Sequence, residues 1–210
     1  MKLRVLESAL QDVSAFAAPK VKLEQYPTPP DLASKFLFAA ESEYQDIHDA
    51  RIVDLGCGCG MLSIAAGIMG AESVVGIDVD SDALEQARQN IDSFEDLPPI
   101  KLVNADISRI EPEFLEELEC DVCIMNPPFG TKIKGIDAVF LDVAFSIAKT
   151  SVYSLHKSST RSFILKKAER CGWTGKVVAQ MRFDLPKTFR FHKQDSKDIF
   201  VDLFRFEPAN

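Results

Sequence analysis

The sequence lacks the long apolar runs that membrane proteins need. No stretch of its 210 residues approaches the roughly 20 consecutive apolar residues of a transmembrane helix. Its first residues, MKLRVLESALQDV, interrupt their apolar pattern with charged and polar side chains, so they also lack the continuous apolar core of a secretory signal. We therefore expect an intracellular protein with no membrane partner.

Cysteines are few, and their number is odd. Without an export signal, five cysteines argue against a disulfide framework and predict reduced thiols. Cys120 and Cys123 have one half of a zinc-binding spacing, but alternation along a strand would point them to opposite faces. We therefore predict core thiols and no metal site. The five residues are Cys57, Cys59, Cys120, Cys123 and Cys171.

The chain also lacks the positive charge that is typical of nucleic-acid enzymes, since its net charge is −8. The charge is unevenly divided, however: residues 1–130 hold 9 Lys and Arg against 24 Asp and Glu, whereas residues 131–210 hold 15 against 8. A basic C-terminal part can attract a phosphate backbone, although a solvated positive face explains the charge equally well. The length predicts a single domain over residues 1–210.

Along the chain, short apolar runs that are typical of strands alternate with segments whose apolar residues recur at helical spacing. Such alternation predicts an α/β fold, with a mostly parallel seven-stranded sheet and helices on both faces. In the last apolar run, apolar and polar residues alternate in part, as in an antiparallel edge strand. Ser81 is the predicted N-cap of the helix at 81–90. The predicted strands are 52–55, 74–77, 100–103, 122–125, 151–155, 176–183 and 199–206; the predicted helices are 61–69, 81–90, 138–149 and 158–171, with another that begins near Asp31.

A glycine-rich loop, VDLGCGCG at residues 53–60, lies at the first strand-to-helix junction. Glycines permit the sharp turn and a close approach of ligand to backbone. The acid that precedes the first glycine by two positions would repel a pyrophosphate and favour an amine-bearing ligand. Here the sequence resembles the class I S-adenosylmethionine methyltransferases, a Rossmann-like family whose D/E-x-G-x-G-x-G loop binds the methionine part of the cofactor. The matching residues are Asp54, Gly56, Gly58 and Gly60.

Acidic residues follow the next two predicted strands. Asp78 stands where an acid can accept hydrogen bonds from both ribose hydroxyls. Asp106 and Ile107 match the family position that reads the adenine ring. Each acid alone could be a helix cap, but ligands of such sheets bind at the carboxyl ends of strands, where all three features meet. We therefore expect S-adenosylmethionine as the cofactor.

The fourth predicted strand ends in the tetrapeptide Asn126-Pro127-Pro128-Phe129. The exocyclic amine of a nucleobase is a weak nucleophile, because its lone pair is delocalised into the ring. The side-chain oxygen of Asn126 and the carbonyl of Pro127 can each accept one N–H of that amine, and Phe129 can stack on the base. The tetrapeptide resembles the N/D-P-P-Y/F/W motif of amino methyltransferases, which act on adenine, cytosine, guanine or a glutamine amide. The motif alone leaves the acceptor open.

Four segments together resemble one family of these enzymes. They are similar to the methyltransferase-like protein five family, the eukaryotic ribosomal-RNA adenine N6-methyltransferases, and the similarity runs from about residue 20 to residue 206. The segments are LEQYPT at 23–28, DLGCGCG at 54–60, MNPPFGTK at 125–132 and VYSLHKSST at 152–160.

This resemblance implies further cofactor contacts. Residues 1–30 would form an N-terminal helix and a segment that closes over the cofactor, with Gln25 and Thr28 as ligands. Cys59 and Met61 would contact the cofactor from the glycine loop, although Met61 replaces a more usual smaller aliphatic residue.

The resemblance also implies a substrate, a partner and a location. The family methylates one adenosine of small-subunit (18S) ribosomal RNA as a heterodimer with a small zinc-binding activator protein. The activator would add a strand to the sheet edge beside Ile100 to Val103. The implied locations are the nucleus and the cytoplasm.

Basic side chains follow the tetrapeptide and the fifth strand, on the rim where the site should open. We expect them to contact RNA phosphates. A basic loop at 184–198, between the last two strands, could grip RNA, with a plain surface hairpin as the competing interpretation. The predicted RNA-binding residues are Lys132, Lys134, His156, Lys157, Arg161, Arg190 and Lys193.

Other functions remain as alternatives. A protein glutamine N5-methyltransferase of translation factors uses the same tetrapeptide, but such enzymes usually carry an additional N-terminal domain, for which about 20 residues are too few. A DNA adenine methyltransferase would need a target-recognition domain. A non-catalytic scaffold that binds RNA or the activator would need neither the intact tetrapeptide nor the acidic cofactor residues.

Overall fold

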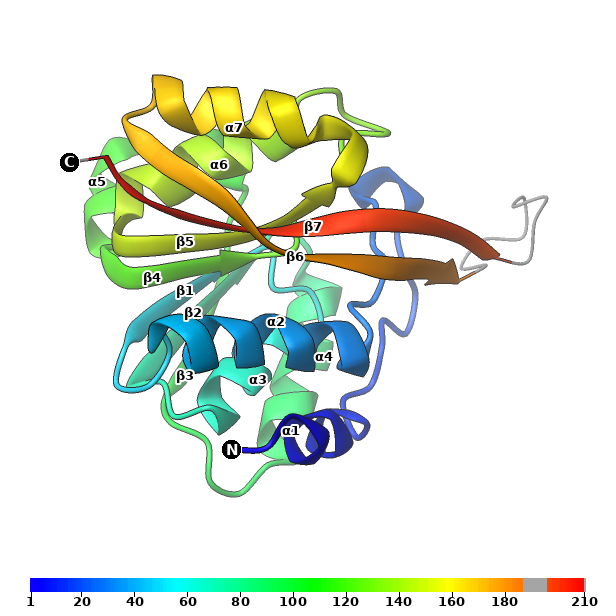
Figure 1. Ribbon diagram of the computed structural model, residues 1–210. Helices are drawn as coiled ribbons and strands as arrows, with labels where there is room; N and C mark the ends of the chain where they lie inside the picture. Colours follow the sequence, from blue (N-terminus) through cyan, green and yellow to red (C-terminus); the bar gives the residue numbers. More distant parts are fainter. Residues whose placement is uncertain (187–195, 210) are drawn as a thin grey trace.

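Seven strands form one mixed sheet in the order β3-β2-β1-β4-β5-β7-β6 (Figure 1). The computed structural model describes the backbone of residues 1–186 and 196–209 and the side chains of residues 1–183 and 199–209. The first five strands run parallel, and β7 is antiparallel to both β5 and β6. The strands are β1 (Arg51–Leu55), β2 (Ser73–Asp78), β3 (Ile100–Asn104), β4 (Cys120–Met125), β5 (Ala148–Lys157), β6 (Trp173–Pro186) and β7 (Ser196–Pro208).

Helices cover both faces of the sheet, as predicted. In Figure 1, α1, α2, α3 and α4 lie below the sheet, and α5, α6 and α7 lie above it. The helices are α1 (Leu3–Leu10), α2 (Pro30–Tyr44), α3 (Met61–Ile68), α4 (Ser81–Asp92), α5 (Pro112–Glu117), α6 (Ile136–Ile147) and α7 (Arg161–Arg170), with short 3-10 turns η1 (Val21–Leu23), η2 (Ile107–Arg109) and η3 (Ser158–Thr160).

Two hydrophobic cores enclose the sheet, because alternate residues of its central strands point to opposite faces. In β1, Ile52 belongs to the core beneath α2 and α3, whereas Val53 and Leu55 belong to the core beneath α6 and α7. Burial on both faces explains why the central strands are almost uninterrupted apolar runs in the sequence.

The last strand is not the edge strand that its alternation predicted. β7 pairs with β5 on one side and with β6 on the other, so β3 and β6 are the edges. The β6–β7 hairpin is also longer than predicted. β6 continues to Pro186 and β7 begins at Ser196, so both ends of the predicted 184–198 loop have strand backbone.

Two helix predictions need correction, and one helix was not predicted. The N-cap of α4 is Asp80 rather than Ser81, and its side chain accepts a 3.1 Å hydrogen bond from the backbone N–H of Asp82. Helix α6 ends at Ile147, so the last two residues of the predicted helix belong to β5. The short helix α5 was not predicted, because six residues give too little periodicity to recognise.

The prediction for the paired cysteines of β4 is half right. Cys120 and Cys123 are buried thiols, but both belong to the core beneath α6 and α7 rather than to opposite faces. The register between β4 and β5 shifts between Cys120 and Val122, and this irregularity interrupts the alternation.

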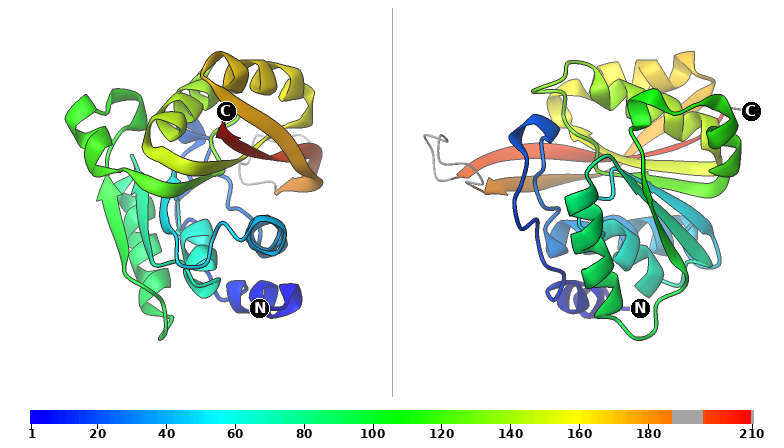
Figure 2. Two further views of the ribbon diagram at one scale, coloured as in Figure 1. Left: turned by 60° about the vertical axis from the view of Figure 1, so that its left-hand side comes forward. Right: turned by 180° about the vertical axis from the view of Figure 1, so that it is seen from behind.

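The chain between α1 and α2 passes across the carboxyl ends of the parallel strands. We call residues 11–29 the strap. In Figure 1 it rises from α1 past the ends of the strands and returns to α2, and Figure 2 shows the same path from behind. The strap therefore covers the edge of the sheet where ligands of such folds bind.

Candidate active site

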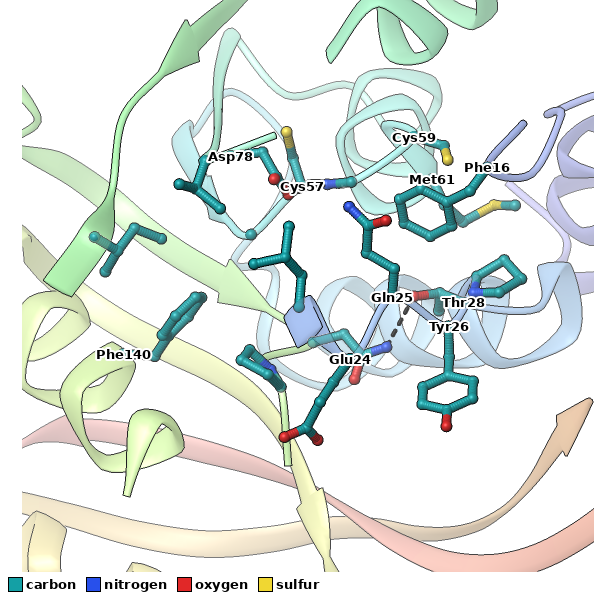
Figure 3. A pocket seen from close by; sticks show the side chains of 18 of the residues that line it. Phe16, Glu24, Gln25, Tyr26, Thr28, Cys57, Cys59, Met61, Asp78 and Phe140 are labelled. Carbon is teal, nitrogen blue, oxygen red and sulfur yellow. Dashed lines mark hydrogen bonds between the residues drawn. The ribbon is translucent and has the colours of Figure 1, made fainter. Parts of the chain in front are cut away.

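A cavity of about 540 Å³ lies between the strap and the carboxyl ends of β1 to β4 (Figure 3). Its volume is in the usual range for small-molecule sites. Most of the predicted cofactor residues line it. They are Gln25, Thr28, Gly56, Gly58, Cys59, Met61, Asp78, Asp106, Ile107 and Asn126, together with Pro128 of the tetrapeptide.

The glycine loop between β1 and α3 forms one wall of the cavity. Gly56 and Gly58 have φ angles of +72° and +53°, in the region that favours glycine. A Cβ atom at Gly58 would lie 2.9 Å from the ring of Phe16, which the strap brings against the loop. The loop therefore needs glycine both for its turn and for its contact with the strap.

Asp54 lies beneath the glycine loop and does not line the cavity. Its Oδ2 accepts a 2.6 Å hydrogen bond from Ser63 of α3, and its buried Oδ1 has no hydrogen-bond partner among the described residues. Burial raises the pKa of Asp54 to about 7, against the opposing effect of the Ser63 hydrogen bond. A cationic amine bound nearby would favour the ionised carboxylate, so the position fits the amino group of S-adenosylmethionine.

Asp78, at the end of β2, has a carboxylate that is fixed in place. Its two oxygens accept 2.9 Å hydrogen bonds from the backbone N–H groups of Gly58 and Asp80. Burial raises its pKa, and these backbone bonds oppose the shift. A carboxylate oxygen can accept more than one hydrogen bond, so Asp78 can still bind a diol such as that of ribose.

Asp106 follows β3 and caps the short turn η2. Its Oδ1 accepts hydrogen bonds from the backbone N–H and the hydroxyl of Ser108, at 3.0 and 2.6 Å. Ile107 is buried in the cavity wall beside it. The pair therefore offers one polar and one apolar contact where the adenine ring is predicted to bind.

Gln25 joins the strap to the turn after β2. Its side-chain Nε2 donates a 2.7 Å hydrogen bond to Asp80, and its Oε1 accepts a 2.7 Å bond from the backbone N–H of Lys20. The Lys20 ammonium pairs with Asp80 and with Asp82. Burial opposes ionisation of Asp80, but the hydrogen bonds from Lys20 and Gln25 outweigh it and lower the pKa of Asp80. The Gln25 amide thus holds the strap in place.

The tetrapeptide follows β4 and reaches the cavity through Asn126 and Pro128. The side-chain Nδ2 of Asn126 donates a 2.9 Å hydrogen bond to Oγ1 of Thr28 on the strap. Pro127 and Phe129 do not line the cavity. The Phe129 ring packs edge-on against Phe183 of β6, with 6.1 Å between the ring centroids. The asparagine therefore faces the cofactor site, and the phenylalanine lies beside it, toward the hairpin.

The predicted RNA-binding residues differ in their exposure and in their contacts. Lys132 and Lys134 are exposed after the tetrapeptide, and the Lys157 ammonium lies 5.6 Å from the centroid of the Phe129 ring. The half-exposed Arg161 makes two hydrogen bonds, of 2.7 and 2.8 Å, to buried Asp202. Arg190 and Lys193 lie outside the described residues.

His156 is not an RNA-facing side chain. It is 1% exposed, its Nε2 lies 2.8 Å from the Ser154 hydroxyl, and its ring packs edge-on against Phe204. Burial lowers its pKa to about 3, so the ring is neutral at physiological pH. A buried neutral ring cannot pair with a phosphate, and the prediction for His156 is wrong.

Several side chains of the site had no signal in the sequence that distinguished them. Asp80 resembles an ordinary helix cap, and its partner Gln25 is distant along the chain. Phe16 of the strap and Phe140 of α6 press against Gly58 and Gly56 and also line the cavity. The apolar periodicity of α6 did include Phe140, so that signal indicated burial but not a site.

Other kinds of site are absent from the described parts of the chain. Residues 1–186 and 196–209 contain no group of three or more His, Cys, Asp or Glu side chains that could hold a metal ion. No helix within them has the length and apolar composition needed to span a membrane.

Known proteins resemble the chain over its whole length. It is 48% identical to the rRNA N(6)-adenosine-methyltransferase METTL5 of Danio rerio over 210 residues, which cover 100% of both proteins. It is also 48% identical to Mettl5 of Drosophila melanogaster, an enzyme of the same name, over 99% of this chain and 97% of that protein. The profile of another family, described as ribosomal protein L11 methyltransferase (PrmA), matches residues 37–126, from α2 to Asn126.

A crystal structure has the same fold. It is that of a candidate RNA methyltransferase from Pyrococcus horikoshii, which superposes with a TM-score of 0.85 at 33% identity and covers 100% of this chain and 97% of that one. The predicted Rossmann-like fold, the cofactor class and the resemblance are thereby confirmed. The chain belongs to the METTL5 family of S-adenosylmethionine-dependent rRNA N(6)-adenosine-methyltransferases.

Proposed function

We propose that this protein transfers a methyl group from S-adenosylmethionine to N6 of an adenosine in small-subunit ribosomal RNA. The observation that carries the proposal is the placement of Asn126 in the wall of the cofactor cavity, at the end of β4. Enzymes that share nearly half of its residues are named for this reaction.

The residues of the chain account for the chemistry. S-adenosylmethionine supplies an electrophilic methyl group when it is bound. The Asn126 side-chain oxygen and the Pro127 carbonyl each accept a hydrogen bond from one N–H group of the adenine amine. These bonds raise the electron density on the nitrogen and fix the direction of its lone pair. Phe129 stacks on the base after it leaves its helix or loop. Phe183 supports the ring of Phe129 from its edge.

The direct test measures the substrate. The purified full chain is incubated with radiolabelled S-adenosylmethionine and with unmodified small-subunit rRNA, a translation release factor or DNA, and the modified RNA is digested to nucleosides. We expect N6-methyladenosine in the rRNA only, and no turnover with Asn126→Ala although that variant binds the cofactor. Label in the release factor but not in RNA would show the protein to be a glutamine methyltransferase instead.

We also propose that the protein works as a heterodimer with a small zinc-binding activator, in the nucleus and the cytoplasm. Strand β3 supports an edge interaction, since it pairs only with β2 among the described strands. Its apolar residues Ile100, Leu102 and Val103 are half-buried rather than buried. An activator strand paired there would cover them and complete their hydrogen bonding.

Copurification tests the partner. Val103→Asp should abolish copurification with the coexpressed activator, because it puts a charge into the interface. Val5→Asp, a charge on an exposed valine of α1, is the matched control and should copurify normally. Equal recovery of the activator with both variants would place the partner elsewhere.

A further inference from the structure

The amide of Asn126 has a hydrogen-bond partner on the strap, the hydroxyl of Thr28. Its nitrogen donates to the Thr28 hydroxyl at 2.9 Å, and both side chains line the cavity. Figure 3 labels Thr28 in the cavity wall. A carboxamide carries its donor nitrogen and its acceptor oxygen on opposite sides of one carbon. With the nitrogen bonded to Thr28, the oxygen is turned away from the Thr28 hydroxyl.

Only this orientation suits an amine substrate. Each N–H of an adenine amine needs an acceptor, and the amide nitrogen of Asn126 is a donor. If the amide turned over, it would present N–H groups to N–H groups and lose the interaction. A hydroxyl can donate as well as accept, so Thr28 selects this orientation when its own proton is donated into the cavity, to an acceptor such as the bound cofactor. A cofactor contact by Thr28 is therefore part of this role.

The strap holds the Thr28 hydroxyl rigidly. Thr28 stands between Pro27 and Pro29, which fix φ on both sides, and a residue before proline is confined to extended conformations. Pro30 then begins α2 at its first position, where proline is favoured. The hydroxyl is therefore attached to a stiff segment that ends in a helix.

A hydrogen bond also joins the strap to the loop that follows the tetrapeptide. The Glu24 carboxylate accepts a 2.7 Å hydrogen bond from the backbone N–H of Lys132, six residues beyond Asn126. On the other side, Gln25 is bound to Asp80. The position of Thr28 relative to Asn126 thus depends on a seated strap.

We propose that Thr28 is a positioning residue for methyl transfer: its hydroxyl orients the Asn126 amide, so that a seated strap sets the acceptor for the substrate amine. This role rests on the proposed function only in requiring a planar nitrogen substrate. It couples cofactor enclosure to catalysis, because the strap that covers the cavity also aligns Asn126.

Three variants of the full chain test this role. Thr28→Val keeps the shape and removes the hydroxyl, Thr28→Ser restores a hydroxyl, and Thr174→Val is the matched control at an exposed threonine of β6, outside the cavity. Thr28→Ala replaces Thr28→Val if the latter does not fold. We would measure kcat and KM, cofactor affinity by calorimetry, and the side-chain amide signal of Asn126 by NMR.

The expected result separates orientation from binding. Thr28→Val should lower kcat about 10- to 100-fold at saturating cofactor and RNA, as expected for a misplaced catalytic group. Saturating cofactor removes any loss of cofactor affinity from this comparison, and the Asn126 amide protons should exchange faster with solvent. Thr28→Ser should recover both readouts, and Thr174→Val should change neither.

Two results would overturn the proposal. One is a normal kcat at saturating cofactor with weakened cofactor affinity, which would make Thr28 a ligand alone. The other is an Asn126 amide signal that is the same in Thr28→Val and the wild type. The NMR measurement needs no substrate, so it stands even if the wild type proves to methylate a glutamine rather than an adenosine.

Discussion

The side-chain amide of Gln25 donates a 2.7 Å hydrogen bond to the carboxylate of Asp80, and both side chains are buried. The bond joins the strap to the turn that also presents Asp78 to the cavity. A buried carboxylate loses much stability when a donor is removed, because water cannot replace that donor. The strap and the cofactor site should therefore respond together to a change at Gln25.

Gln25→Leu keeps the volume of the side chain and removes its donor. We expect it to lower the free energy of unfolding by about 1–3 kcal/mol and to weaken cofactor binding. Urea unfolding and calorimetry measure the two effects. Gln89→Ala, on the exposed face of α4, should change neither. Unchanged cofactor affinity in Gln25→Leu would show that the strap does not depend on this bond.

Gly58→Ala tests the close contact between the glycine loop and the strap. The new Cβ would have a positive φ and would lie 2.9 Å from the Phe16 ring, so cofactor affinity and stability should both fall. Gly172→Ala separates the two causes, because Gly172 has φ of +78° but no atom within 4 Å of its Cβ position. This control should lose about 1–2 kcal/mol from backbone strain alone and should bind the cofactor normally. Equal cofactor affinities in the two variants would contradict the proposed contact.

The sequence predicted the sheet well because its strands are buried runs bounded by glycine and proline. The prediction failed where it depended on which helices cover a given face of the sheet. His156 directly follows the predicted strand 151–155 and looked like a rim residue. It belongs to β5, however, its side of that strand is covered by α6, and its Nδ1 lies 3.9 Å from Asp137 of that helix. The alternation along a strand shows to which face of the sheet a side chain points. It does not show whether a helix covers that face.

The order of the last two strands shows a similar limit. Trp173 to Pro186 come first in the chain, yet β7 inserts between β5 and β6. Nothing in the periodicity of two neighbouring antiparallel strands decides which of them is the edge. Asp78, Asp106 and Asn126 were predictable for the opposite reason, because they lie at or just beyond the carboxyl ends of parallel strands, and the parallel order brings those ends together. Gln25 and Thr28, on the strap, were implied only by the family resemblance.

The titration of Asp54 should give stability a measurable dependence on pH. Burial raises its pKa from 3.8 to about 7, so the folded protein holds a proton that the unfolded chain releases over this range. The stabilisation is present below the unfolded pKa and is lost as pH rises through about 7. Relative to Asp54→Asn, which does not titrate, the wild type should lose stability between pH 3.8 and about 7, the interval between the two pKa values.

Urea unfolding of both proteins at each pH measures this difference. His156 acts in the opposite sense, since burial lowers its pKa from 6.5 to about 3 and its contribution is lost as pH falls. His156 is present in both proteins, so its effect cancels in the comparison. Parallel stability curves for the wild type and Asp54→Asn would contradict the raised pKa.

Lys157 is the described basic side chain that lies over the catalytic aromatic ring, with its ammonium 5.6 Å from the centroid of Phe129. A base stacked on Phe129 would bring its own phosphates close to this ammonium. Lys157→Gln should therefore weaken binding of an rRNA fragment and reduce the slope of log affinity against log salt by about 0.7–0.9, the value for one phosphate contact. Lys166→Gln, on the exposed side of α7, is the matched control and should leave the slope unchanged. If Lys157 only packs against Phe129, its loss would lower kcat and leave the salt dependence of binding equal to that of the control, which would remove Lys157 from the RNA-binding surface.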